Sequence, residues 1–445
     1  MKIAMIGQKK IPSRDGGVEV VVGELSSRMV QGGNEVVCYN RYEDTRNNPP
    51  RKWQGVKMVR VFTFKAQSLN AAFYSFVAAF ISLFGHFDIM HYHAEGPSFM
   101  TFLPKLFGYP VVVTIHGLDW QRAKWGNFAA WYIKQGEKMA AKMADALIVL
   151  SKENQRYFKE TYGRETYYIP NGVTIHSQTR PEVIREKWGL KKDSYILFMA
   201  RLVPEKGAHY LIEAFRRINT DKRLVIAGPL KSTDYVRHLQ AQAAGDDRIL
   251  FTDFVQGKEL EELMSNCYVY VLPSDIEGMP LSLLEAMSYG SRCIVSDISE
   301  NRETSGSFAD YFSKGDSGRL KERLEKVLTE GERDRSSKLE EIDFVRHAYD
   351  WDIVMLDTMR VYWDVRIERL EKQKLFRGSQ AGIYQEELQE NIKLLENKRN
   401  RLTLSILDCY RNGKDFKLED VRYFKRYSSE IEILADELKR VRKIR

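Results

Sequence analysis

The chain has 445 residues, 29% of them charged, and a formal net charge of +8. This length exceeds what a single hydrophobic core serves, so we expect two or three structural units. The four cysteines are scattered without a C-x-x-C pair, which indicates neither a disulfide framework nor a zinc site. The sequence opens on the apolar segment Lys2-Ile-Ala-Met-Ile6 and shows no secretory leader, so we expect a cytoplasmic location.

Apolar strands alternate with helices through roughly the first 300 residues, a pattern typical of parallel sheets covered by helices on both faces. We predict an α/β protein with one Rossmann-like domain over 1–178 and a second over 179–345. The link between the two domains follows the turn at Asn171-Gly172. A helix over 346–370 comes next, and we predict that 371–445 is helical as well.

A loop after the first strand ends in Gly16-Gly17, directly before a helix predicted from about Val18 to Met29. Glycines at a helix N-terminus let the backbone approach an anionic ligand closely. The sequence has no G-x-G-x-x-G fingerprint, which argues against a dehydrogenase.

Two further strands of this half run into histidines. The strand Val111–Ile115 ends before His116, and another leads into His91-Tyr92-His93. Ligand-contacting side chains lie at the carboxyl ends of parallel strands in open α/β sheets. We therefore place His93 on the acceptor side of a cleft, while a structural histidine that caps its strand is the alternative for His116. Without a third spaced ligand, a metal site at the His91/His93 pair is not expected.

The second half carries a pair of cations and a pair of carboxylates. Arg201 follows a buried strand and Lys206 precedes a helix, so both can reach a diphosphate. Glu277 and Glu285 flank the start of another helix, whose free backbone N–H groups can hold an anion or sugar hydroxyls. An ordinary acidic helix start and two surface cations are the alternative.

Together, the pair Arg201/Lys206, the spacing Glu277-x7-Glu285 and the segment Pro170-Asn171-Gly172-Val173 resemble glycosyltransferase family 4, in its bacterial polysaccharide-type members. The likeness runs from Met1 to about Leu370. It implies the GT-B fold, in which two Rossmann-like domains face a cleft, and a retaining enzyme that uses a nucleotide sugar. It also implies that 346–370 crosses back to pack on the first domain.

By this resemblance, Arg201 and Lys206 bind the donor diphosphate, Glu277 contacts the transferred sugar, and Glu285 binds the ribose hydroxyls. His116 matches a family histidine that faces the donor sugar. The predicted catalytic residues are thus Arg201, Lys206, Glu277 and His116. The glycine loop and the amides after Glu277 supply further donor contacts, at Gly16, Gly17, Gly278, Met279 and Leu281.

The motif Asp350-Trp351-Asp352 has the Asp-x-Asp form with which a different class of glycosyltransferase binds a metal ion. Here it precedes a helix, where an acidic first turn caps free N–H groups, so we predict that both aspartates are capping residues. The resemblance implies no metal and no other cofactor besides the nucleotide-sugar co-substrate.

The predicted function is transfer of a sugar to a glycan or lipid-linked saccharide, in the biosynthesis of a cell-surface polysaccharide such as capsule or exopolysaccharide. A non-hydrolysing sugar-nucleotide epimerase on the same fold is one alternative. A catalytically silent scaffold that acts through its tail is another.

Residues 66–85 contain no charge and five aromatic residues, and polar residues interrupt the run. We predict a partly exposed helix of the first domain and not a membrane span. Basic residues precede it, at Lys52, Lys57, Arg60 and Lys65. This arrangement suits peripheral contact with an anionic inner membrane leaflet, with a core helix beside a solvated loop as the alternative.

The tail shows two apolar series at heptad-like spacing, Leu388 to Ile406 and Phe424 to Val441, separated by a turn at 411–414. Such series form a helical hairpin or an intermolecular coiled coil, so self-association through 384–444 is a candidate. The basic and acidic residues of the tail alternate, which argues against binding to nucleic acid.

Overall fold

The first sheet of this protein has eight strands in the order β3-β4-β2-β1-β5-β6-β7-β8, all paired in parallel except β3 with β4. The computed structural model describes residues 1–42, 50–63, 69–121, 126–331, 333–372, 379–411 and 418–444. The strands of this sheet are β1 (Lys2–Ile6), β2 (Glu35–Tyr42), β3 (Lys52–Trp53), β4 (Val56–Phe62), β5 (Ile89–His93), β6 (Val111–Ile115), β7 (Ala146–Val149) and β8 (Tyr167–Tyr168).

Helices cover both faces of the first sheet, as a parallel sheet requires. One face packs against α2 and α5 through small and aromatic side chains such as Tyr74 and Ala140, and the other packs against α1 and α15. The helical elements of this domain are α1 (Gly17–Gln31), α2 (Leu69–Ser82), η1 (Leu83–Gly85), α3 (Glu95–Ser98), η2 (Phe99–Thr101), α4 (Phe102–Leu106), η3 (Asp119–Gln121), α5 (Asn127–Met143) and α6 (Lys152–Tyr162).

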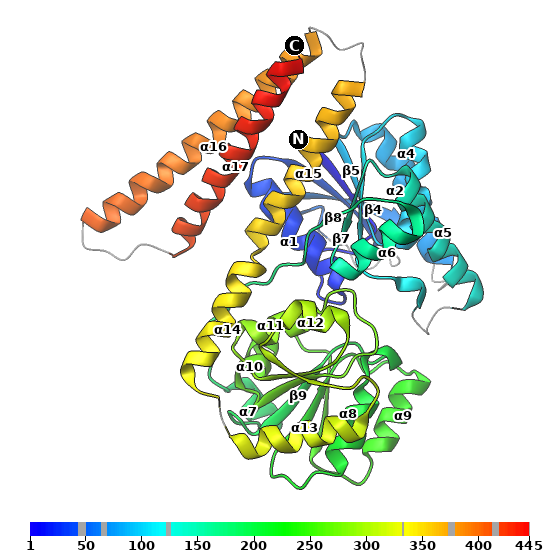
Figure 1. Cartoon of the computed structure of the whole chain (residues 1–445), viewed down its shortest axis with the longest axis vertical. Coiled ribbons are helices and arrows are strands. Elements are labelled where there is room, and N and C mark those ends of the chain that lie inside the picture. The colour runs from blue at the N-terminus through cyan, green and yellow to red at the C-terminus, as the bar shows by residue number, and fades with distance from the viewer. Residues whose placement is uncertain are drawn as a thin grey trace.

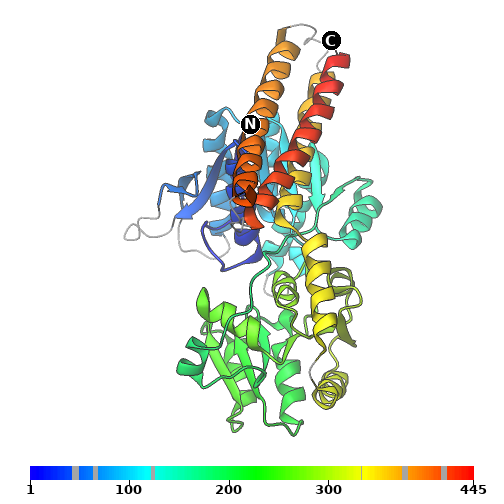
Figure 2. The ribbon, with the colours of Figure 1, turned by 90° about the vertical axis from the view of Figure 1, so that its left-hand side faces the viewer.

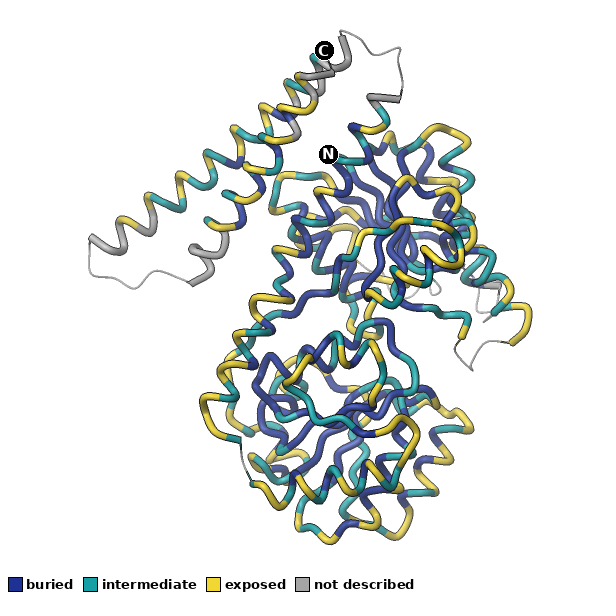
Figure 3. Tube along the Cα trace, viewed as in Figure 1, coloured by how far each residue is buried: buried dark blue, intermediate teal, exposed yellow. Residues whose placement is uncertain are grey.

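The second sheet has six parallel strands in the order β11-β10-β9-β12-β13-β14 and lies in a separate domain (Figure 1). Its strands are β9 (Tyr195–Met199), β10 (Arg223–Ala227), β11 (Ile249–Asp253), β12 (Val269–Leu272), β13 (Cys293–Ser296) and β14 (Ala309–Phe312). Its helical elements are α7 (Val183–Trp188), η4 (Pro204–Lys206), α8 (Ala208–Arg216), α9 (Asp234–Ala243), α10 (Lys258–Asn266), α11 (Leu281–Ser288), α12 (Ser299–Ser305), α13 (Ser317–Glu330) and α14 (Arg335–Ala348). Figure 3 shows that the buried residues concentrate in the two sheets.

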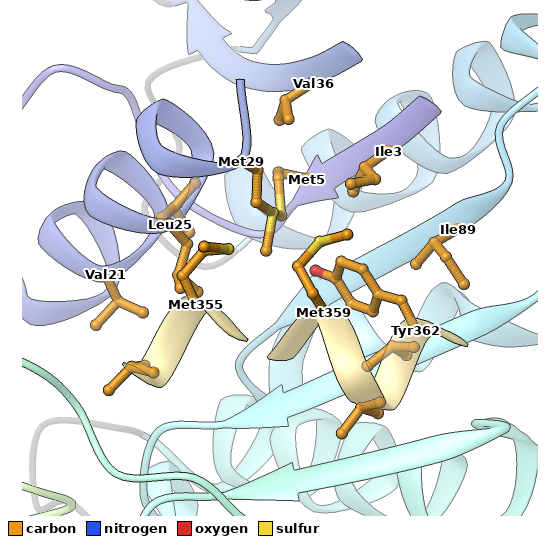
Figure 4. Packing of buried hydrophobic residues seen from close by; sticks show 14 of the residues in the cluster. Ile3, Met5, Val21, Leu25, Met29, Val36, Ile89, Met355, Met359 and Tyr362 are labelled. Carbon is orange, nitrogen blue, oxygen red and sulfur yellow. The ribbon is translucent and has the colours of Figure 1, made fainter. Parts of the chain in front are cut away.

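After α14 the chain returns to the first domain as α15 (Trp351–Lys372), the helix expected over 346–370. Met355, Met359 and Tyr362 pack against α1 and the strands β1 and β5 (Figure 4). The helix therefore completes one face of the first sheet and ties the two domains together.

The tail forms two long helices, α16 (Ser379–Arg411) and α17 (Leu418–Ile444), which lie side by side (Figure 2). Of the two alternatives for the tail, the structure shows the hairpin, and α17 also contacts α15. Leu388, Tyr427 and Leu434 bury Trp363 and Ile367 of α15. The predicted turn at 411–414 lies mostly outside the described residues.

Part of the segment 66–85 lies outside the described residues, as does Lys65, and α2 begins at Leu69. One side of α2 buries Tyr74, Ala78 and Ala79, while Phe76 and Phe80 are about half exposed. A partly exposed helix of the first domain was predicted here, and this prediction is confirmed. Among the described helices, none combines the length and the apolar character that crossing a bilayer demands.

Candidate active site

The two domains meet at the N-terminal end of α11, where the backbones approach each other very closely. A Cβ added to Gly278 would lie 1.8 Å from the carbonyl oxygen of His116, and one added to Gly117 would lie 3.0 Å from the Cα of Gly278. Gly17 also faces the second domain, where a Cβ added to it would lie 3.4 Å from Cδ1 of Leu281, in ordinary van der Waals contact. The predicted donor segments of the two domains therefore form facing walls, and Gly278 fits because it has no side chain.

The cation and carboxylate motifs of the second domain are joined by a buried ion pair. Lys206 Nζ lies 2.5 Å from Oε1 and 2.6 Å from Oε2 of Glu277, and the hydroxyl of Ser274 donates to Oε1 at 2.7 Å. Glu277 is 7% exposed, so this pair is largely shielded from water. The sequence separates the two residues by 71 positions, and the fold brings them together.

Tyr270 connects the strand that leads to Arg201 with the helix that carries Glu285. Its buried hydroxyl donates to the carbonyl of Met199 at 3.2 Å and lies 2.8 Å from Ser282 Oγ, whose hydroxyl can donate in return. Arg201 comes two residues after Met199 in the chain and is partly buried. This bridge fixes the carboxyl end of β9 beside the start of α11.

Glu285 forms an ion pair across the cleft with Arg14, which belongs to the loop before Gly16-Gly17. The Glu285 side chain is 18% exposed and that of Arg14 is 40% exposed. Arg14 was not among the predicted site residues. Its position two residues before the glycine pair is the signal that could have identified it.

Three histidines form a chain behind the wall of the first domain. His93 Nδ1 lies 3.1 Å from His116 Nε2, and the ring of His91 lies tilted by 35° to that of His93, with centroids 4.1 Å apart. His91 is in turn held by Tyr362 of α15 at 2.6 Å and by Thr114 at 2.7 Å. Burial lowers the pKa of His91 to about 3 and that of His93 well below its usual range, so both rings are neutral.

His93 is completely buried, whereas His116 is partly exposed. Contact of His93 with an acceptor remains a prediction, and its burial instead favours support of His116. If Nδ1 of His93 donates to Nε2 of His116, a neutral His116 carries its proton on Nδ1.

The Asp-x-Asp segment has structural partners. Oδ1 of Asp350 accepts the backbone N–H of Asp352 at 2.7 Å, which confirms Asp350 as the cap of α15. Asp352 does not cap the helix with its side chain, because its Oδ1 accepts from Arg28 Nε at 3.0 Å. This ion pair joins α15 to α1.

The arrangement concentrates lysine, arginine and free helix amides around two carboxylates, at an interface of two domains. Cations and amides can bind a diphosphate, and carboxylates can bind sugar and ribose hydroxyls. The individual donor and catalytic roles of the predicted residues remain predictions. Among the described residues, no group of three or more histidine, cysteine or carboxylate side chains could hold a metal ion.

Comparison with known proteins identifies the class. A family model described as Glycosyltransferase Family 4 matches residues 15–177, and one described as Glycosyl transferases group 1 matches residues 181–341. An uncharacterized glycosyltransferase of Methanocaldococcus jannaschii is 32% identical over 394 residues, which cover 81% of this chain and 98% of that protein. The chain therefore belongs to glycosyltransferase family 4.

Two further relatives match over shorter stretches. The UDP-Gal:alpha-D-GlcNAc-diphosphoundecaprenol alpha-1,3-galactosyltransferase of Escherichia coli is 31% identical over 265 residues, covering 55% of this chain and 67% of that protein. An uncharacterized glycosyltransferase of Bacillus subtilis is 30% identical over 231 residues, covering 51% of this chain and 61% of that protein.

Solved structures show the fold. Sucrose-phosphate synthase from Thermosynechococcus elongatus superimposes with a TM-score of 0.71 at 20% identity, over 82% of this chain and 98% of that one. HepE from Anabaena, in complex with UDP and glucose, gives a TM-score of 0.67 at 18% identity, over 81% and 99%. The predicted GT-B fold with a helical C-terminal extension is confirmed.

Proposed function

We propose that this protein is a retaining glycosyltransferase that moves a sugar from a nucleotide-sugar donor to a glycan or lipid-linked saccharide, in the biosynthesis of a cell-surface polysaccharide. The observation that carries this proposal is the meeting of Lys206, Glu277 and the start of α11 with the His116-Gly117 wall of the other domain. It supports a donor bound between the domains, with its diphosphate on Arg201 and Lys206.

In the proposed reaction, the bond between the anomeric carbon and the diphosphate oxygen breaks while the acceptor oxygen bonds to the same face of that carbon. The leaving diphosphate takes the proton of the acceptor hydroxyl. The cations then act by stabilising charge that develops on the leaving group, and the two walls act by positioning. Glu277 is engaged by Lys206 and Ser274 and is not assigned as a nucleophile.

The proposal of a lipid-linked acceptor is based on the names of two relatives. The E. coli relative is named for a diphosphoundecaprenol acceptor, and a Bacillus subtilis relative of 25% identity is named for teichuronic acid biosynthesis. Nothing in the comparisons supports the epimerase alternative.

A panel of donors tests the proposal. Purified protein is incubated with UDP-, dTDP- and GDP-sugars, and we expect one nucleotide series to raise the melting temperature. Transfer from that donor is then measured with lipid-linked and soluble saccharides, and the product's anomeric configuration is read by proton NMR. An inverted linkage would contradict the retaining mechanism, and interconversion of the sugar nucleotide without transfer would favour an epimerase.

We also propose peripheral contact with an anionic membrane surface, through what we call the aromatic face. This face consists of Phe76, Phe80 and Phe84 beside α2, and Phe128 and Trp131 on α5. Their exposed fractions run from 48% to 70%. Both helices bury their other side against the same face of the first sheet. Figure 1 shows α2 and α5 on the side of the first domain that lies away from the hairpin.

The charges around the aromatic face support an anionic partner. The sequence of α2 contains no charged residue, and α5 presents Lys138 and Lys142 at helical spacing from Trp131, with Glu137 turned inward. Aromatic rings that insert beside lysines are typical of helices that lie on anionic bilayers.

Vesicle flotation tests this contact. We expect the full chain to float with vesicles containing phosphatidylglycerol and not with pure phosphatidylcholine. The Phe80→Ser/Phe84→Ser variant should bind about tenfold more weakly, because two exposed rings no longer insert. Leu339→Ser, at an exposed position on α14, is the matched control. Failure of the full chain to float would contradict the membrane contact while leaving the transferase proposal intact.

A further inference from the structure

The loop that follows β6 is held by two buried carboxyl groups that lie outside the candidate donor site. Oε2 of Glu95 accepts the backbone N–H of Asp119 at 2.8 Å. Oε2 of Glu137 accepts the indole N–H of Trp120 at 2.8 Å. Both carboxyl groups are shielded from water, since Glu95 and Glu137 are 0% exposed. The loop therefore has one anchor on its backbone and one on a side chain.

This loop begins with His116 and Gly117, which form the first domain's wall against Gly278. Glu95 begins α3, two residues after His93, the last residue of the neighbouring strand β5, which hydrogen-bonds to His116. Movement of the loop would thus shift both the wall and the histidine. The carboxyl groups support the site from behind and do not line the cleft.

The backbone that presents Glu95 is itself held in a conformation that side chains seldom adopt. Ala94 has φ 72° and ψ 161°, which non-glycine residues rarely take. Its N–H donates to the carbonyl of Thr114 on β6 at 2.9 Å. The carbonyl of Glu95 lies so close to α5 that a Cβ on Gly136 would come within 2.0 Å of it. Such a placement persists only where the surrounding structure fixes it.

Glu137 is surrounded by donors. Its Oε1 accepts from Lys134 at 2.8 Å, from Tyr157 at 2.8 Å and from Tyr162 at 2.5 Å. Burial raises the pKa of Glu137, but the hydrogen bonds from Lys134 and the tyrosines outweigh it and lower the pKa overall. Glu137 is therefore ionised.

For Glu95, burial and the neighbouring charges act on the pKa in the same direction. Burial raises its pKa well above the usual range, and the nearby charges of Asp119 and Glu137 raise it further. Glu95 and Glu137 hold consecutive residues of the same loop, and two carboxyl groups that interact in a dry site titrate as a pair. Oε1 of Glu95 is buried and has no hydrogen-bond partner among the described residues, so this oxygen can carry a proton.

We infer that Glu95 and Glu137 form a proton-sharing carboxyl pair that positions the His116–Gln121 loop, and with it His116, for sugar transfer. The inference rests on the proposed transferase function for its consequence in catalysis, but not for the shared proton. In this pair, Glu95 acts as a neutral donor to Glu137 and as an acceptor for Asp119. Both are positioning residues, since neither contacts the donor site directly.

A neutral amide reproduces this role and distinguishes it from a charged one. In Glu95→Gln, the amide oxygen can accept from Asp119 and the amide N–H can donate to Glu137. We therefore expect Glu95→Gln to keep kcat within about twofold of wild type, because both hydrogen bonds survive. Glu95→Ala should lower kcat by about tenfold or more, because a loop displaced by even 1 Å misplaces reacting groups.

Glu137→Gln should also lower kcat by about tenfold, because the amide is a weaker acceptor than the carboxylate for Lys134 and the two tyrosines. The nucleoside diphosphate to be used is the one that raises the melting temperature of the wild type. Its Kd for Glu95→Ala and for Glu137→Gln should stay within about threefold of the wild-type value, since Arg201 and Lys206 lie in the other domain. Glu341→Gln, a buried carboxyl in α14 paired with Arg333, is the matched control and should change neither quantity.

A second measurement tests the proton without requiring activity. The infrared difference spectrum, wild type minus Glu95→Gln at neutral pH, should contain the carbonyl stretching band of one protonated carboxylic acid. Absence of this band would overturn the shared proton, even if no sugar transfer is ever found. Equal damage in Glu95→Gln and Glu95→Ala would overturn the neutral role of Glu95. A loss of kcat that only follows the loss of folded protein would overturn positioning of His116.

Discussion

At the scale of single residues, the donor site keeps its carboxylates neutralised before a donor arrives. Glu277 is held by Lys206 within the second domain, and Glu285 is paired with Arg14 of the first domain. A donor that brings hydroxyls to the carboxylates and a diphosphate to the cations would exchange these contacts for its own. The cations would then face the negative charge that develops on the leaving diphosphate.

The cations give the first prediction. Arg201→Ala and Lys206→Ala should each lower kcat by about 10² or more, because each loses a contact that strengthens as the diphosphate leaves. Steady-state transfer assays measure this, with Lys314→Ala, an exposed lysine of the same domain, as control. Near-wild-type turnover in both folded variants would rule out the proposed donor site.

Gly278 gives a second prediction at this scale. Gly278→Ala should weaken nucleotide-sugar turnover by about tenfold or more, because its Cβ would collide with the His116 carbonyl and separate the walls. Gly382→Ala, where nothing lies within 4 Å, should leave turnover unchanged and can only stabilise α16. Calorimetry and transfer assays on both variants measure the effect, and equal behaviour of the two would show that the close contact has no role.

At the scale of elements, the hairpin is part of the first domain's packing. Arg426 of α17 is completely buried, donates to the carbonyl of Arg28 and lies 3.8 Å from Asp352. Lys398 of α16 donates to the carbonyl of Gln31 at 2.7 Å. These contacts tie the hairpin to the C-terminal end of α1, the helix whose first turn carries Gly17.

Removal of the hairpin is therefore expected to destabilise the protein. A chain ending at residue 372 would expose Trp363 and Ile367, which are 2% and 0% exposed in the full chain. We expect a lower melting temperature, because large apolar side chains lose burial worth roughly 1.5–3 kcal/mol each. Scanning calorimetry of both forms measures this. An unchanged melting temperature would show that the hairpin is an independent appendage.

Self-association through 384–444 remains a prediction. The stripe that was expected to need a partner is largely covered by α15 in the same chain. Light scattering of the full chain decides the question, and the mass of a single chain at micromolar concentration would contradict self-association.

We expect the stability of the docked hairpin to depend on pH, because Glu430 of α17 is buried. Burial raises the pKa of Glu430 from 4.5 to about 7, against the opposing effect of Arg426. Because the folded pKa is raised, the contribution to stability is complete below about pH 4.5 and is lost as the pH rises through about 7. Glu430→Gln should therefore raise the melting temperature at pH 8 relative to wild type and not at pH 4.5. An identical pH profile for both proteins would refute this.

At the scale of the whole molecule, two domains and one returning helix build a site for which independence from a metal ion stays a prediction. The cations Lys206 and Arg14 and the amides at the start of α11 can offset the charge of a diphosphate. We therefore expect activity to survive excess EDTA. Assays with EDTA, and then with added Mg²⁺ or Mn²⁺, measure this. Full loss on chelation that either metal restores would contradict the expectation and direct attention back to Asp350.

The sequence by itself determined the local features of this protein. Alternating strands and helices, helix starts after glycine or aspartate, and the positions of Arg201, Lys206 and the two glutamates can all be recognised over short stretches, because side-chain periodicity and capping act locally. The family resemblance then supplied the fold, which these local signals alone leave open.

Only the tertiary structure decided which of these residues meet. The pairing of Arg14 with Glu285, the burial of His93 behind His116 and the docking of Arg426 onto α1 join residues far apart in the chain. Glu95 and Glu137 look like ordinary acidic residues in the sequence, yet they share a dry site beneath the loop after β6. Their surroundings come from the order of strands and the packing of helices, and no local pattern encodes that order.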